Sequence, residues 1–169
     1  HEEEKAAEAM IQAEQWFKAG AYELALNGDS LGVMGFVAVA DEYSNTKAGN
    51  LANAYAGMAL AQLKKFGEAV EYLQDFSADD AVIAPAAMGT LGNCYAQLGQ
   101  NDKAAATLVK AAKKANNTTL SPIYYLQAGQ IYESLGKNAE ALNCYETIKA
   151  NYPQSIYSGE IVKYIERLK

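Results

Sequence analysis

Three glycines and three alanines recur at matched spacing, and this constrains the fold of the chain more than any other feature. Gly57, Gly92 and Gly129 stand 35 and 37 residues apart, and each precedes an alanine by twelve residues. The alanines are Ala69, Ala104 and Ala141. A period of about 34 residues is typical of helix–turn–helix repeats. Such repeats bury their core between neighbours, so the sequence predicts an all-α solenoid.

The composition fits a folded helical domain and argues against several classes of function. Half of the 169 residues are hydrophobic and a fifth are charged, which suffices to fill a core without disulfides or metals. The net charge of −6 argues against binding to nucleic acid or to anionic lipid, both of which need a basic face. We interpret Cys94 and Cys144 as small buried hydrophobes rather than as parts of a disulfide framework.

Helix-forming stretches alternate with turn residues along the chain. The segment 27–30 (Asn-Gly-Asp-Ser) interrupts the pattern early, and we expect Asp29 or Ser30 to cap the helix that follows. Gly99 and Gly136 are expected to end helices in a left-handed conformation. The predicted helices cover residues 2–18, 31–43, 47–64, 66–76, 83–98, 102–115, 122–135, 138–150 and 156–168.

These helices predict one repeat domain over residues 1–169, with about four helix pairs and a C-terminal capping helix. The predicted parts are a divergent first unit (1–45), repeats over 46–81, 82–118 and 119–153, and the capping helix (154–169). The last helix has a one-sided apolar stripe and a charged opposite side. A solenoid needs such a helix at its exposed end.

The recurring glycines and alanines have a packing explanation. Their lack of bulk lets the two helices of a pair approach closely. Larger side chains four residues after each alanine are expected to fill the same seam. These side chains are Leu73, Leu108 and Tyr145.

The repeats resemble the tetratricopeptide repeat family, whose pattern of Leu-Gly, Tyr, Gly, Ala and Ala recurs in this chain. The matching residues are Leu91, Gly92, Tyr95, Gly99, Ala104 and Ala111 in one copy, Gly129, Tyr132, Gly136, Ala141, Tyr145 and Pro153 in the next, and Gly57, Phe66 and Ala69 in a weaker third. The family's tryptophan position holds Asn53, Met88 and Tyr125 instead. The resemblance covers roughly residues 47–153 and implies a tetratricopeptide-repeat α-solenoid.

In that family the first helix of each pair lines an inner groove, and the resemblance implies that a partner binds there. The corresponding positions are Leu51, Ala54, Met58 and Gln62, then Ala86, Gly89, Asn93 and Gln97, then Ile123, Leu126 and Gln130. This lining is apolar and amide-bearing. It favours an extended or helical peptide segment over a terminal carboxylate, because Gly89 and Leu126 supply no basic side chain for a clamp.

The sequence offers little for catalysis or for metal binding. The only histidine is His1, so no Ser-His-Asp or Cys-His arrangement is expected. The pair Asp79–Asp80 is expected to cap a turn, and no cofactor or metal is expected. We therefore predict a non-catalytic scaffold that binds a partner protein or peptide. The alternative is a glycan- or small-ligand-binding module for nutrient acquisition, which would use tyrosines that the repeat pattern leaves unassigned: Tyr124, Tyr125, Tyr152, Tyr157 and Tyr164.

A narrower resemblance concerns residues 36–76 and 152–155. These segments are similar to membrane-anchored periplasmic proteins of Gram-negative bacteria, a group that includes the accessory subunit of the Sec translocon, and they suggest the Bacteroidetes as the lineage. The resemblance implies a place on the periplasmic side of the inner membrane, in protein export or envelope assembly. We expect membrane attachment only through an N-terminal anchor that precedes this chain. Self-association through the first helix is left open.

Overall fold

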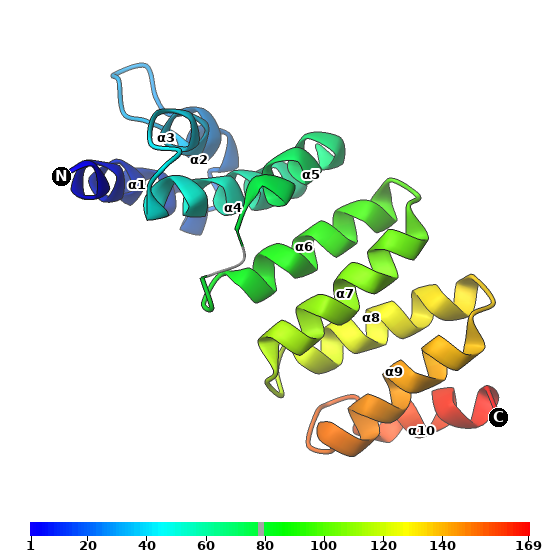
Figure 1. Ribbon diagram of the computed structural model, residues 1–169. Helices are drawn as coiled ribbons and strands as arrows, with labels where there is room; N and C mark the ends of the chain where they lie inside the picture. Colours follow the sequence, from blue (N-terminus) through cyan, green and yellow to red (C-terminus); the bar gives the residue numbers. More distant parts are fainter. Residues whose placement is uncertain (78–79) are drawn as a thin grey trace. The chain divides into compact units, whose positions relative to one another are not determined.

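The computed structural model describes residues 1–77 and 80–169, and every regular element in these two stretches is an α-helix (Figure 1). The helices are α1 (Glu2–Lys18), α2 (Tyr22–Asn27), α3 (Phe36–Glu42), α4 (Lys47–Gln62), α5 (Phe66–Asp75), α6 (Ala84–Gln97), α7 (Asn101–Ala115), α8 (Ser121–Ser134), α9 (Asn138–Asn151) and α10 (Ser158–Arg167). The predicted all-α class is confirmed. Apart from the helix expected at 31–43, each predicted helix is present, with ends within two residues of the expected ones.

The helices fall into two compact units. Unit 1 (His1–Ile83) contains α1 to α5, and unit 2 (Ala84–Lys169) contains α6 to α10. In unit 2 each helix packs against the next one along the chain, as stacked helical hairpins do (Figure 1). In unit 1, α4 packs against α1, α2, α3 and α5 and is therefore the central helix.

The predicted seam of small residues is confirmed in all three helix pairs. A Cβ atom placed on the glycine of each pair would collide with the side chain that follows the recurring alanine by four residues. The closest distances are 2.4 Å for Gly57 and Leu73, 2.8 Å for Gly92 and Leu108, and 2.5 Å for Gly129 and Tyr145. Real Cβ atoms do not approach side chains this closely, so glycine is what allows the paired helices to pack.

The turns inside the pairs also follow the prediction. Gly99 and Gly136 have φ angles of 76° and 74°, which is the left-handed conformation that glycine adopts without strain. The corresponding turn of unit 1 places a lysine in the same conformation, because Lys64 has a φ of 63°. A residue with a Cβ atom is strained there.

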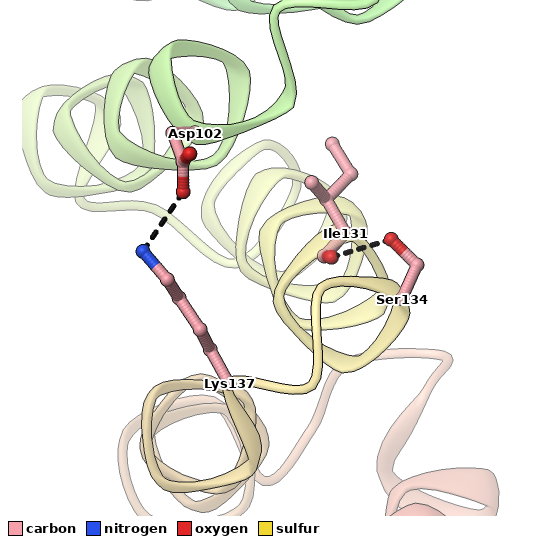
Figure 2. A network of polar contacts seen from close by, with 4 residues as sticks. All are labelled: Asp102, Ile131, Ser134 and Lys137. Carbon is pink, nitrogen blue, oxygen red and sulfur yellow. Dashed lines mark hydrogen bonds and ion pairs between the residues drawn. The ribbon is translucent and has the colours of Figure 1, made fainter.

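Polar contacts tie neighbouring helix pairs of unit 2 together. The Lys137 ammonium, in the turn between α8 and α9, donates to Asp102 at the start of α7 across 2.8 Å (Figure 2). A nearby bond lies within α8 alone, where the Ser134 hydroxyl donates to the Ile131 carbonyl in the last turn of the helix (Figure 2). Between α7 and α8, the buried Ser121 hydroxyl donates to the Ala112 carbonyl at 2.7 Å. The surface ion pair contributes little stability, whereas the buried bond fixes where α8 begins.

Both cysteines lie in the core of unit 2, as predicted. Cys94 and Cys144 are buried and free, and burial raises the pKa of each thiol to about 11. Protonated buried thiols are poor nucleophiles. The core around Cys144 is formed by α7, α8, α9 and α10, with Leu108, Tyr145 and Ile148 fully buried.

The prediction of a helix over residues 31–43 is wrong for its first five residues, and α3 confirms the rest of it almost to the predicted end. The chain forms the short α2 before the interruption and begins α3 only at Phe36, whose N-cap Gly35 makes no side-chain capping bond. The predicted cap at Asp29 or Ser30 is also wrong. The Asp29 carboxylate accepts hydrogen bonds from the Leu31 and Val33 amides within the connecting loop.

The acidic turn between α5 and α6 is described only in part, because Asp79 lies outside the described residues. The Asp80 carboxylate accepts hydrogen bonds from the amides of Val82 and Ile83 at 2.9 and 3.1 Å. These amides precede α6, so Asp80 has the capping role expected of it. Among the helices of the described residues, none has the length and hydropathy needed to span a membrane.

Candidate functional site

The predicted groove positions differ widely in how much surface they offer. They lie on α4 in unit 1 and on α6 and α8 in unit 2. The exposed ones are Gln62, Asn93, Gln97 and Gln130; the half-buried ones are Leu51, Ala86, Ile123 and Leu126; the buried ones are Ala54, Met58 and Gly89. The surface that these positions expose therefore consists mainly of amide side chains, with partly exposed aliphatic groups between them.

The buried position Gly89 is a packing position between two repeats. A Cβ atom there would lie 2.4 Å from the ring of Tyr124 on α8. The ring thus occupies the space that a side chain at position 89 would need. Ala54 and Met58 are likewise core residues of unit 1, with 0% and 8% of their surface exposed.

A hollow of about 420 Å³ lies between α1 and α4 in unit 1. Its apolar residues are Ala7 and Met10 from α1 and Ala48 and Leu51 from α4, and its charged residues are Glu3, Glu4, Glu14 and Lys47. The α1 residues recur at positions 3, 7, 10 and 14, a spacing that aligns side chains along one face of a helix. Leu51 is the predicted groove residue that this hollow includes.

The Glu3 carboxylate has a structural role at the edge of this hollow. It accepts hydrogen bonds from the Lys47 backbone amide at 3.1 and 3.3 Å. Lys47 is the first residue of α4, and a carboxylate there satisfies a free amide and complements the positive end of the helix dipole. Glu3 therefore holds α1 against the start of α4. Within the described residues, no ion pair engages Glu4 or Glu14.

A second hollow of about 580 Å³ shares Glu3, Lys47 and Leu51 with the first. Its other lining residues are polar: Ser44, Asn45, Thr46, Asn50, Ser77 and Asp80. The Asn50 side chain donates to the Ser77 carbonyl at 3.0 Å and accepts from the Ser77 amide at 2.7 Å. This pair of bonds fixes the end of α5 beside α4. The two hollows thus meet at three shared residues, and the second is the more polar of the two.

In unit 2 a third hollow of about 330 Å³ lies between α8 and α10 and includes the predicted groove residue Gln130. Glu133 connects the residues around it through hydrogen bonds. The Glu133 carboxylate accepts from the Arg167 guanidinium at 2.6 Å and from the Tyr145 hydroxyl at 2.7 Å. Burial alone raises the pKa of Glu133, but these hydrogen bonds outweigh burial and hold the pKa below its ordinary value. The Arg167 guanidinium also stacks on the Tyr164 ring at 4.8 Å.

Most of the tyrosines that the glycan-binding alternative would use are buried and cannot contact a ligand. Tyr124, Tyr125 and Tyr152 are buried, and only Tyr157 and Tyr164 keep part of their surface exposed. For the buried Tyr124 and Tyr125, loss of hydration raises the hydroxyl pKa. In residues 1–77 and 80–169 no group of three or more His, Cys, Asp or Glu side chains is arranged to hold a metal ion.

Comparison with known proteins identifies the helix pairs of unit 2. Residues 85–117, spanning α6 and α7, match the tetratricopeptide repeat family, and so do residues 124–155, spanning α8 and α9. Unit 2 carries tetratricopeptide repeats. The resemblance predicted from Gly92, Ala104, Gly129 and Ala141 is thereby confirmed for these two copies.

Solved structures extend the fold assignment to almost the whole chain. The crystal structure of MamA protein is 21% identical, with a TM-score of 0.68 over 98% of this chain and 90% of that chain. A Podosopora anserina putative kinesin light chain with nearly identical tetratricopeptide-like repeats is 14% identical, with a TM-score of 0.67 over 99% and 86%. No curated protein matches the sequence. These likenesses confirm the tetratricopeptide-like solenoid fold.

The predicted site residues do not include the α1 side chains that line the hollow between α1 and α4. The groove positions were carried over only to tetratricopeptide copies that contain the recurring glycine, and α1 has none. The signal was nevertheless present, because Glu3, Ala7, Met10 and Glu14 form one stripe of a helix that was correctly predicted. Their carboxylates make this hollow more acidic than the predicted amide lining.

Proposed function

We propose that this chain is a non-catalytic protein-interaction scaffold whose partner binds along the first helices of its repeats. The observation that carries the proposal is the hollow between α1 and α4, with apolar groups from both helices and carboxylates along α1. Apolar side chains of a partner segment gain affinity by leaving water, and charged groups at the rim select its orientation and charge. Tetratricopeptide repeats and structural neighbours with the same fold support this kind of function.

The partner expected for this hollow is a peptide segment with apolar anchors and basic flanking residues. Glu4 and Glu14 flank Ala7 and Met10 on one stripe of α1, so Lys or Arg residues on either side of an apolar side chain would complement it. In unit 2, Asn93, Gln97 and Gln130 supply exposed amides that hydrogen-bond to a peptide backbone.

Site-specific photocrosslinking tests this proposal in cells that express the full-length protein. A photoreactive amino acid is placed at Ala7 or at Leu51, which line the same hollow of unit 1, and the control position is Ala106, an exposed residue on α7. We expect the first two positions to crosslink to the same partner polypeptide and the control to give no crosslink. Equal crosslinking from Ala106, or none from Ala7 and Leu51, would contradict the proposed site.

The structure also decides which substitutions are useful. A charge at the buried Met58 would disrupt the core of unit 1, so loss of binding there would be uninformative. Ala7→Arg changes an exposed residue and places a positive charge in a hollow expected to hold basic residues. We expect it to weaken partner binding by about tenfold or more, while Ala106→Arg leaves binding unchanged.

We further propose that the protein works on the periplasmic side of the inner membrane, in protein export or envelope assembly, attached by an N-terminal anchor. The support is the similarity of residues 36–76 and 152–155 to membrane-anchored periplasmic proteins. Protease added to spheroplasts containing the full-length protein should digest this domain. Protection from the protease would contradict the periplasmic location. Identification of translocon subunits or envelope chaperones in the crosslinks would support the pathway, and exclusively cytoplasmic partners would refute it.

A further inference from the structure

The two units carry opposite net charges, which the value of −6 for the whole chain conceals. Unit 1 contains 5 basic and 14 acidic side chains, a net charge of −9, and unit 2 contains 9 basic and 6 acidic side chains, a net charge of +3. The ion pairs of unit 2 each join one basic to one acidic side chain and leave this excess unchanged. A chain that is acidic as a whole thus has a basic half.

Four basic residues of unit 2 lie on α7, the second helix of its pair, and all four are exposed: Lys103, Lys110, Lys113 and Lys114. At 3.6 residues per turn, Lys103, Lys110 and Lys114 fall within an arc of about 40°. Lys113 lies about 80° from Lys103, on the same half of the helix surface. We call these four residues the α7 lysine face. The predicted groove positions lie on α4, α6 and α8, so this face is a separate surface.

Helix stability does not account for this face. Within residues 1–77 and 80–169, none of the four lysines is in an ion pair. The negative end of the helix dipole stabilises Lys113 and Lys114 in the last turn of α7, but the positive end opposes Lys103, the third residue of the helix. Lys110 and Lys114 are four residues apart, where like charges destabilise a helix. An anionic partner would relieve this repulsion.

We propose that the α7 lysine face is a docking site for a short acidic segment of a partner protein. Lys103 and Lys114 are eleven residues apart, or about 16 Å along the helix axis. An extended segment of about five or six residues covers this length, and its alternate side chains point to the same side, about 7 Å apart. This spacing is close to the rise of about 6 Å between Lys110 and Lys114. Acidic residues at alternate positions of the segment therefore place a carboxylate beside each of these two ammonium groups.

The charge distribution favours a short segment over a larger anion. A nucleic acid or an anionic membrane extends far beyond one helix, so the net charge of −9 on unit 1 opposes its approach. A second copy of the chain, with its own net charge of −6, is likewise repelled as a whole. A segment of about six residues covers α7 alone, and exposed charges interact over only about 8 Å at physiological salt. Such a segment gains attraction from the lysines with little repulsion from unit 1.

Fluorescence anisotropy of a labelled hexaglutamate peptide tests the proposal on the purified chain. We expect saturable binding at low ionic strength that weakens as salt is added, because salt screens exposed charges. Lys110→Glu/Lys114→Glu should raise the dissociation constant at least about tenfold, since repulsion replaces two attractive contacts. Lys110→Gln/Lys114→Gln should weaken binding less, because it adds no acidic groups. The matched control is Lys163→Glu/Lys169→Glu, which makes the same change of net charge at exposed positions of unit 2 outside α7.

The substituted lysines are exposed, so folding should be retained, and far-UV circular dichroism checks this. Absence of saturable hexaglutamate binding, or equal weakening in the matched control, overturns the proposal.

Three further measurements separate the acidic segment from other anions. Phosphatidylglycerol vesicles and a short DNA duplex are titrated with the wild type and with Lys110→Glu/Lys114→Glu, and the mass of both chains is followed by sedimentation velocity. We expect no vesicle binding, no DNA binding and no dimer that depends on these lysines. If vesicles or DNA bind more tightly than hexaglutamate and the variant loses that binding, the face recognises that polyanion and the proposal is wrong. A wild-type dimer that the variant loses would assign the face to a second copy and would also refute it.

Discussion

Replacing Gly129 by alanine tests the packing argument for the repeats at the site where it is most demanding. The added methyl group would lie 2.5 Å from Cε1 of Tyr145 and 3.0 Å from two further ring atoms. The ring has no free space to retreat into, because Tyr145 is fully buried and packs on Tyr164 with 5.3 Å between ring centroids. Its hydroxyl donates to Glu133, which Arg167 also holds.

The expected cost follows from three opposing contributions. Overpacking a core costs about 1–3 kcal/mol, and displacing the hydroxyl from the Glu133 carboxylate costs about 1.5–3 kcal/mol. Alanine in place of glycine within a helix returns about 1 kcal/mol. We therefore expect Gly129→Ala to lower the free energy of unfolding by about 3 kcal/mol. Urea denaturation followed by circular dichroism measures this change as a lower midpoint at unchanged slope.

Two variants make this experiment decisive. Gly67→Ala is the control, because nothing lies within 4 Å of a Cβ atom at position 67, and we expect it to be neutral or stabilising by up to about 1 kcal/mol. In a Tyr145→Leu background the rigid ring is gone, so Gly129→Ala should cost less than it does beside tyrosine. The reasoning is refuted if Gly129→Ala is as stable as the wild type, or if its cost is the same beside leucine.

Lys64→Gly should raise the free energy of unfolding by about 1 kcal/mol, because the left-handed conformation at Lys64 strains a residue with a Cβ atom; an unchanged urea midpoint would contradict this. Burial raises the pKa of the Cys94 and Cys144 thiols from 9.0 to about 11, so neither should react with a thiol reagent at neutral pH until the protein unfolds. Because burial raises these two pKa values, the protonated thiols stabilise the fold fully below pH 9, and this contribution is lost as the pH rises to about 11. Replacing both cysteines by alanine should therefore reduce the fall in melting temperature between pH 9 and about pH 11. The lowered pKa of Glu133 contributes stability that is lost as the pH falls below the ordinary value of 4.5, and Arg167→Ala should reduce this acid dependence; an unaltered acid profile would contradict the role of the ion pair.

The recurring seam was predictable because its cause is local. Two helices joined by a short turn must touch along one line, so the small residue on one and the large residue on the other recur at fixed sequence distances. Gly92 with Leu108 and Gly129 with Tyr145 show the same contact with different side chains. Sequence periodicity therefore gave the helix boundaries of unit 2 almost without error.

The loop over residues 28–35, between α2 and α3, shows where periodicity alone fails. Leu31 and Val33 have the spacing and hydrophobicity of a buried segment, yet both are exposed, because Asp29 bonds to their amides rather than to the first turn of a helix. The contrary signal was three glycines within eight residues, at positions 28, 32 and 35. Gly32 and Gly35 fall inside the predicted helix, and each costs about 1 kcal/mol there relative to alanine.

The groove illustrates a different limit, because helical phase fixes where a side chain points but not whether a neighbour covers it. Gly89 has the phase of a groove residue and is hidden by the Tyr124 ring. Glu4 and Ala7, which line the hollow of unit 1 and are exposed, lie on α1, which lacks the recurring glycine altogether. In unit 2 the recurring glycine commits one face of each first helix to close packing against its partner helix, and α1 has no such glycine. We therefore expect α1 to contribute most to the selection of a partner. Ala7→Arg should change which partner binds more strongly than any substitution of Gly89 that leaves the fold intact.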